Sequence, residues 1–153
     1  MSYLDKNKTL ADCLMDVYKF NKFGKQDVSL EPRLISEEEF RKQKALIIEE
    51  LNETEEALKA GDKIEVLDGL VDLLYVYLGL VNRFGMWEQV IKGFKVVHDN
   101  NMTKIFDPYG NNIAVFKKVI DQDGNEVEKI GKPEGYERVD LKAYFPELLE
   151  EGN

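Results

Sequence analysis

Residues 67–81, LDGLVDLLYVYLGLV, constrain the fold of this chain more than any other stretch. They belong to a segment, 62–85, with an aspartate placed as helix N-cap and a glycine as C-cap. Apolar side chains point in nearly every direction around this helix, a pattern typical of a buried helix. Yet Asp68 and Asp72 share one stripe with Glu65, and an unpaired carboxylate in an apolar interior is costly. The sequence therefore predicts that the acidic stripe faces another helix.

The preceding segment provides a matching acidic surface. It is predicted to be a helix that follows Ser36 as N-cap and ends at Gly61, and Glu39 lies where a capping-box partner would. A loop of only a couple of residues makes the two helices antiparallel neighbours. This packing places residues near 50–53 opposite residues near 68–72. Five carboxylates then converge: Glu49, Glu50, Glu53, Asp68 and Asp72.

Such a cluster is typical of a site for a hard divalent cation. Mg²⁺ and Mn²⁺ prefer oxygen ligands, and carboxylates spaced by three or four residues on facing helices provide them. The alternative for Glu49, Glu50 and Glu53 alone is a solvated helix face paired with lysines. Asp72 favours the metal site, because its neighbours on both sides are apolar.

The rest of the chain predicts a mainly α fold. Helices are expected from Leu10 to Phe23, with Cys13 in the core, and from Met86 to about Asn101. The second of these is expected to turn one face inward, made of Trp87, Val90, Ile91, Phe94 and Val97 or His98.

After Lys104 the pattern changes to alternation. A β-hairpin is expected with its turn at Asp123–Gly124, and a short helix near 146–152. We interpret residues 1–153 as one domain. Its helical core covers about 6–104, and the hairpin and tail cover about 105–153.

Charge and composition exclude several classes of partner. The 30 acidic against 21 basic residues give a net charge of −9, which would repel a nucleic-acid polymer or an anionic membrane. The longest strongly apolar stretch, Leu73–Val81, is far shorter than a membrane span. A single cysteine, Cys13, rules out an intrachain disulfide and favours a reducing, cytoplasmic compartment.

Four sequence motifs carry a resemblance to a known superfamily: EELNE at 49–53, which matches EExxE, DGLVDLLY at 68–75, VHDNNMTK at 97–104 and GKPEGY at 131–136. In these motifs the chain resembles the MazG-like all-α NTP pyrophosphatases over roughly residues 10–140, and most of all the phosphoribosyl-ATP pyrophosphohydrolase-like group.

The chain departs from the superfamily pattern in the tail, where relatives tend to carry a proline and this chain has Arg138-Val139, and in the motif that ends at Asp72. The usual partner motif is ExxD, but the residue three before Asp72 is Gly69. Either Asp68 or Glu65 takes the place of the missing acid, and the sequence leaves both open.

The resemblance implies a four-to-five-helix MazG-like bundle with a small C-terminal β-hairpin. It implies Mg²⁺-dependent hydrolysis of a (deoxy)nucleoside triphosphate to the monophosphate and pyrophosphate, with Mn²⁺ as a substitute. Glu50 or Glu53 would take the proton of a metal-bound water. Asn101 and Lys104 match family positions that suit substrate and phosphate contacts.

Two alternatives and two further expectations accompany this interpretation. Phosphoribosyl-ATP is the alternative substrate, and a catalytically silent helical interaction module is the alternative outside the enzymes. His98, the only histidine, is expected to be structural and hydrogen-bonded rather than catalytic. A helix as apolar as 62–85 predicts a homodimer or a higher homo-oligomer.

Overall fold

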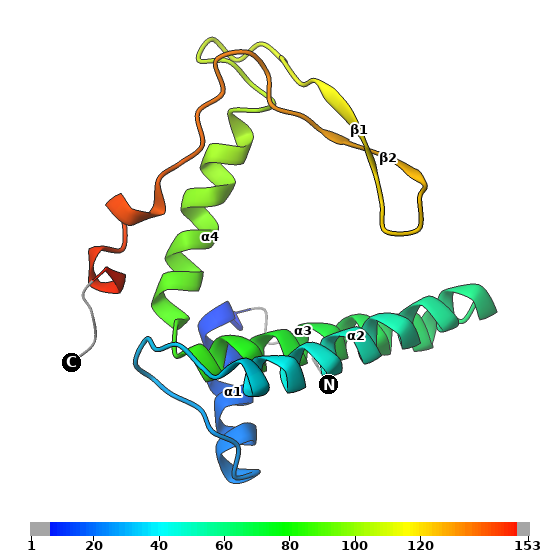
Figure 1. Cartoon of the computed structure of the whole chain (residues 1–153), viewed down its shortest axis with the longest axis vertical. Helices are drawn as coiled ribbons and strands as arrows, with labels where there is room; N and C mark the ends of the chain where they lie inside the picture. Colours follow the sequence, from blue (N-terminus) through cyan, green and yellow to red (C-terminus); the bar gives the residue numbers. More distant parts are fainter. Residues whose placement is uncertain (1–6, 150–153) are drawn as a thin grey trace. The chain divides into compact units, whose positions relative to one another are not determined.

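The structure is a computed structural model that describes residues 7–149 of the chain. In this part the fold is mainly α with a small antiparallel hairpin, as predicted (Figure 1). The elements are α1 (Leu10–Phe23), α2 (Glu37–Ala60), α3 (Lys63–Phe84), α4 (Trp87–Met102), β1 (Phe116–Ile120), β2 (Glu126–Ile130) and the 3₁₀ turns η1 (Leu141–Ala143) and η2 (Pro146–Leu148).

The helix ends follow the capping signals in the sequence. The Ser36 side chain accepts a hydrogen bond from the Glu39 N–H at the start of α2. Asp62 does the same for the first free N–H groups of α3. Gly61 and Gly85 adopt left-handed backbone conformations that end these two helices, with φ of 72° and 64°. Local chemistry alone therefore accounts for the lengths of α2 and α3.

The chain divides into two compact units, Met1–Ile91 and Lys92–Asn153, and α4 contributes residues to both. In the first unit, α2 and α3 run antiparallel and side by side, and α1 packs against α3 (Figure 1). The core is formed by Leu14 and Val17 of α1 with Leu78 and Val81 of α3. Three partly buried residues pack against it: Cys13, Trp87 and Val90. Cys13, expected in the core, is therefore at the edge of the core and only partly buried.

A buried asparagine links α1, α3 and the start of α4. Asn82 has no solvent exposure, and its amide donates to the Leu14 carbonyl at 3.3 Å. Its side-chain oxygen accepts a hydrogen bond from the indole N–H of Trp87. A buried amide that satisfies both partners fixes the relative position of these segments in a way that apolar contacts alone do not.

The prediction that α3 is buried on nearly all sides is wrong for the single chain. Its N-terminal two-thirds expose a row of apolar side chains, defined here as the α3 apolar face: Leu67, Leu70, Val71 and Leu74, each 51–57% exposed. The reason is that α3 is longer than the stretch that α1 covers. The buried contacts of α1 fall on the C-terminal part of α3, around Leu78 to Asn82, and α2 covers one side only.

The inward face expected for α4 is confirmed only at its first turn. Trp87 and Val90 pack against the core, whereas Phe94 is 71% exposed and Val97 38% exposed. His98 is also exposed. The helical periodicity was correct, but periodicity does not tell how far along a helix a partner extends.

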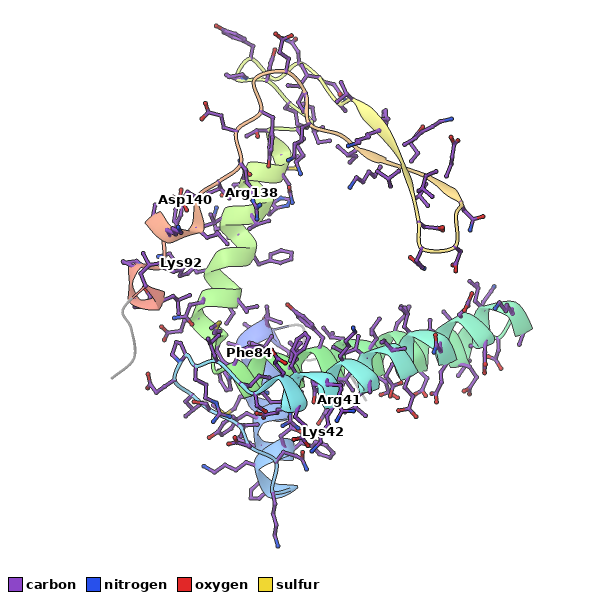
Figure 2. The ribbon with its side chains drawn as sticks, in the orientation of Figure 1. Arg41, Lys42, Phe84, Lys92, Arg138 and Asp140 are labelled. Atoms are coloured by element: carbon purple, nitrogen blue, oxygen red, sulfur yellow. The ribbon has the colours of Figure 1, made fainter. Side chains whose placement is uncertain are left out.

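The second unit holds the hairpin and the tail. β1 pairs with β2 in antiparallel register from Phe116–Ile130 to Ile120–Glu126, and Gly124 in the turn has φ of 83°, which confirms the predicted break. Near the C-terminus, Lys92 of α4 reaches the η1–η2 segment (Figure 2), where it donates to the Tyr144 carbonyl and lies over the Phe145 ring. The short helix expected near 146–152 is the single 3₁₀ turn η2, and 150–153 lie outside the described residues.

None of the described helices is both long enough and apolar enough to span a membrane.

The Asn82 link makes a prediction about stability. Replacement of Asn82 by Ala leaves the Trp87 N–H without its partner and opens a gap. We therefore expect the free energy of unfolding to fall by about 1–3 kcal/mol. Urea unfolding followed by far-UV circular dichroism measures the change. Asn52→Ala, at an exposed position of α2, is the matched control and should not destabilise the protein. Equal stabilities of the two variants would contradict the structural role of Asn82.

Candidate active site

The five predicted carboxylates lie on the facing helices of the first unit. Glu49, Glu50 and Glu53 are on α2, and Asp68 and Asp72 are on α3, across the tight connection formed by Gly61 and Asp62. Glu50 is half-buried, and the other four are exposed.

The pKa of Glu50 indicates that the five carboxylates influence one another electrostatically. Burial raises the pKa of Glu50 above its usual value, and the negative charges of Asp72, Glu53, Glu49 and Asp68 raise it further. Acids of both helices are therefore near enough to Glu50 to raise its pKa. The antiparallel arrangement predicted from the short loop therefore does bring the two acidic segments together.

No basic side chain neutralises the cluster within the described part of the chain. The ion pairs of α2 involve glutamates near its two ends: Glu38 with Lys42, Glu39 with Arg83, and Glu55 with Lys59. Glu49, Glu50 and Glu53 form none, and neither do Asp68 and Asp72. The lysine-paired surface considered as an alternative for the glutamates is therefore not what residues 7–149 form.

The donor set fits a hard divalent cation, but the side chains are not yet arranged as ligands. Among the described residues, no three Asp, Glu, His or Cys side chains stand close enough together to hold a metal ion as they are. Carboxylate oxygens in excess negative charge are nevertheless what Mg²⁺ and Mn²⁺ require.

Gly69 explains why the acidic pattern of α3 differs from ExxD. Gly69 is buried against α2, where a Cβ would lie 2.2 Å from the Thr54 hydroxyl oxygen and 3.1 Å from its Cβ. Thr54 in turn donates to the Glu50 carbonyl at 2.7 Å. A glutamate at position 69 would push the two helices apart. Asp68, beside it, is one of the carboxylates that raise the Glu50 pKa.

Asn101 and Lys104 lie together in the second unit. The Lys104 ammonium donates to the Asn101 side-chain oxygen at 2.9 Å and lies 5.1 Å from the centre of the Tyr136 ring. The predicted substrate residues are thus close to each other, and they are described within their own unit, separately from the carboxylates of the first.

Asn100 is a residue that sequence reasoning missed. Its amide donates to the Glu137 carbonyl, and its side-chain oxygen accepts hydrogen bonds from the Tyr136 hydroxyl and the Val139 N–H. These bonds join the end of α4 to the tail. The signal was present in the sequence, since Asn100 and Tyr136 belong to HDNNMTK and GKPEGY, two of the motifs that carried the resemblance.

His98 has a surface position rather than the hydrogen-bonded structural role expected for it. Its side chain is exposed on α4, and no hydrogen bond to it is present among the described residues. Its neighbour Asp99 has a lowered pKa, mainly because Lys95 donates a hydrogen bond to it, with a smaller contribution from His98. Nothing in this arrangement gives His98 a catalytic role.

Two antiparallel helices with carboxylates that form no ion pair among residues 7–149 define the class of protein: a helical protein with an acidic surface shared by two helices. The family follows from comparison. A sequence model described as phosphoribosyl-ATP pyrophosphohydrolase matches residues 17–101, more than half of the 153 residues. The chain belongs to this family, which lies in the MazG-like all-α NTP pyrophosphatase superfamily. A search of curated proteins found no match.

Family membership confirms two of the predictions. The family consists of hydrolases that act on phosphoric anhydrides, so the chain is a nucleotide pyrophosphohydrolase and its substrate is a small phosphorylated nucleotide. This excludes the silent interaction module as the family's role. The matched range contains all five carboxylates and Asn101, whereas Lys104 and the hairpin lie beyond it.

The raised pKa of Glu50 predicts how stability depends on pH without metal. Between the ordinary glutamate pKa, about 4.3, and the raised value, the folded state binds more protons than the unfolded state. Stability is therefore lost as the pH rises through this window. Glu50→Gln removes the effect and should be more stable than wild type at pH 7 in EDTA, by less than about 1 kcal/mol because water screens the site.

Urea unfolding at pH 4 and pH 7 measures this difference, which should disappear at the lower pH. Glu56→Gln, an exposed change on the same helix, is the control and should follow wild type at both values. An identical pH dependence for Glu50→Gln and wild type would contradict the clustering of charge around Glu50.

Proposed function

We propose that this protein hydrolyses a (deoxy)nucleoside triphosphate to the nucleoside monophosphate and pyrophosphate in the presence of Mg²⁺. The observation that carries the proposal is the unneutralised charge around Glu50, contributed by acids of two facing helices. A chain of net charge −9 would repel a triphosphate unless cations lay between them. Membership in a pyrophosphohydrolase family supports the same reaction.

Each acidic side chain has a role in this proposal. Mg²⁺, or Mn²⁺ in its place, would be held by Glu49, Glu50, Glu53, Asp68 and Asp72. When bound, the ion supplies electrophilic polarisation of the phosphate and a water of lowered pKa. A carboxylate oxygen of Glu50 or Glu53 accepts the proton of the attacking water. Asp68 rather than Glu65 completes the set, because Asp68 is among the acids that act on Glu50.

Lys104 and Asn101 are proposed as the phosphate-binding and substrate-binding pair of the second unit. Two contacts hold the ammonium of Lys104 in place: its hydrogen bond to Asn101 and its position over the Tyr136 ring. An ammonium held in this way suits a negatively charged phosphate group.

Phosphoribosyl-ATP is the second candidate substrate, and the description of the matching family favours it. Both candidates contain the same triphosphate and need the same carboxylates. They differ in the groups attached to the base, so a substrate panel distinguishes them.

A pyrophosphate-release assay tests the reaction. The wild-type protein is incubated with each (deoxy)NTP and with phosphoribosyl-ATP. Each substrate is tested separately in Mg²⁺, in Mn²⁺ and in EDTA. We expect metal-dependent release that falls about 100-fold or more in Asp72→Asn, since loss of a group that stabilises transition-state charge typically costs this much. Glu56→Gln should keep wild-type rates. No release from any substrate by folded protein would overturn the proposal.

The α3 apolar face supports a homodimer or a higher homo-oligomer. Leu67, Leu70, Val71 and Leu74 form a continuous exposed row, and contiguous apolar surface of this kind marks an interaction site. A second copy of the chain offers the same row, as a two-fold interface requires. A free, half-buried Cys13 suits a reducing compartment, and we propose that the protein acts in the cytoplasm.

Sedimentation velocity at micromolar concentration tests the oligomer. Wild type should sediment as a dimer or larger species. Leu70→Glu, which places a charge in the middle of the α3 apolar face, should shift it to monomer. Tyr109→Glu, at a 90% exposed position in the other unit, is the control and should sediment like wild type. A monomeric wild type would contradict the prediction.

A further inference from the structure

A pocket lies among α1, α2 and α3 next to the carboxylates. Its volume is about 390 Å³, and its lining includes Phe20, Asn21, Gln26, Gln43, Tyr75 and Arg83. Two more lining residues locate it along the helices, because Leu46 is four residues before Glu50 and Val76 is four residues after Asp72. The pocket is therefore about one helical turn, roughly 6 Å, from the acidic cluster.

Arg83 fixes the orientation of two amide groups in this pocket. It donates from Nε to Gln43 Oε1 at 2.9 Å and from Nη2 to Gln26 Oε1 at 2.8 Å. Glu39 accepts from Nη1 and balances the charge. Because each side-chain oxygen accepts a hydrogen bond from Arg83, each amide nitrogen is held as a donor, and that of Gln26 donates to the Gly24 carbonyl at 3.4 Å.

Gly79 allows two amides to approach each other. Gln43, only 4% exposed, uses one of its two N–H groups to bind the Val76 carbonyl. A Cβ at Gly79 would lie 3.1 Å from Gln43 Nε2 and 3.4 Å from Asn21 Nδ2. The Asn21 amide is half-buried, and it has no hydrogen-bond partner among the described residues. Donors from α1 and α2 therefore converge with bonding capacity left over.

Two aromatic rings stand at the same pocket. Phe20 and Tyr75 meet edge to face with their centres 5.5 Å apart. Phe20 is 63% exposed, so one of its faces is free to receive a flat ring. Exposed aromatic faces are a common platform for nucleobases.

We propose that this pocket binds the base of the nucleotide substrate, with the base stacked on Phe20 and read by the amides of Asn21 and Gln43. The convergent N–H groups favour a base with a keto oxygen at C4 of a pyrimidine or C6 of a purine, as in uracil, thymine or guanine; these are called the keto-bearing bases below. The inference rests on the proposed function, because it places the base one turn from the metal-binding acids.

Kinetics with two kinds of substrate test the pocket. Asn21→Leu removes the amide, and Phe20→Ala removes the platform. KM is measured for each (deoxy)NTP and for deoxyribose 5-triphosphate, which lacks a base. We expect KM for keto-bearing bases to rise about tenfold or more in each variant, with kcat and the base-free substrate unchanged. Phe23→Ala, on the same helix but outside the pocket, is the control.

Two results would overturn the base pocket. One is an equal change with the base-free triphosphate, which would mean a general effect on the site. The other is a lower KM of the wild-type protein for adenine and cytosine nucleotides than for keto-bearing ones, with the same preference in Asn21→Leu. Asn21→Asp keeps the shape and replaces the donor by an acceptor, so it should also lose the keto-bearing bases even if Asn21→Leu folds poorly.

A binding measurement separates this inference from the proposed reaction. Titration calorimetry with non-hydrolysable α,β-methylene dUTP and dATP in Mg²⁺ needs no turnover. Base-dependent binding that weakens in Asn21→Leu, without hydrolysis by wild type, would keep the pocket and overturn the reaction. Hydrolysis by wild type, with an affinity that depends neither on the base nor on Asn21, would keep the reaction and overturn the pocket.

Discussion

The close contact between α2 and α3 is the constraint on which the rest of the first unit depends. At Gly69 the two helices approach so closely that a single added carbon would meet Thr54. This contact, with the tight connection at Gly61 and Asp62, sets the register that places Glu50 near Asp72. Packing at a glycine thus fixes an electrostatic arrangement one turn away.

That arrangement is held together in spite of its charges. The acids around Glu50 repel one another, and no ion pair among the described residues compensates them. The stabilising interactions lie elsewhere, in the Leu14, Val17, Leu78 and Val81 core and in the buried Asn82 link. A site that is unfavourable by itself and supported by a separate core suits a protein whose ligand brings positive charge.

The two ends of α3 have different roles. Its C-terminal third is buried by α1, and the pocket around Gly79 forms there because small and amide side chains leave room. Its N-terminal part keeps the acids and the α3 apolar face. The proposed base contacts would then lie near Tyr75 and Gly79, while the acids and the α3 apolar face alternate around the helix between Leu67 and Leu74.

Capping, periodicity and short loops are local, so the helices with their ends, the hairpin turn and the two acidic segments could be predicted from the amino-acid sequence. Local patterns do not reveal that α3 stays open along Leu67 to Leu74, that Asn100 joins the tail to α4, or that Arg83 turns two glutamines toward a pocket. These features depend on how far a partner helix extends, or on hydrogen bonds whose partners are separated in the chain by 36 to 57 positions. Only the folded arrangement of the helices brings such partners together.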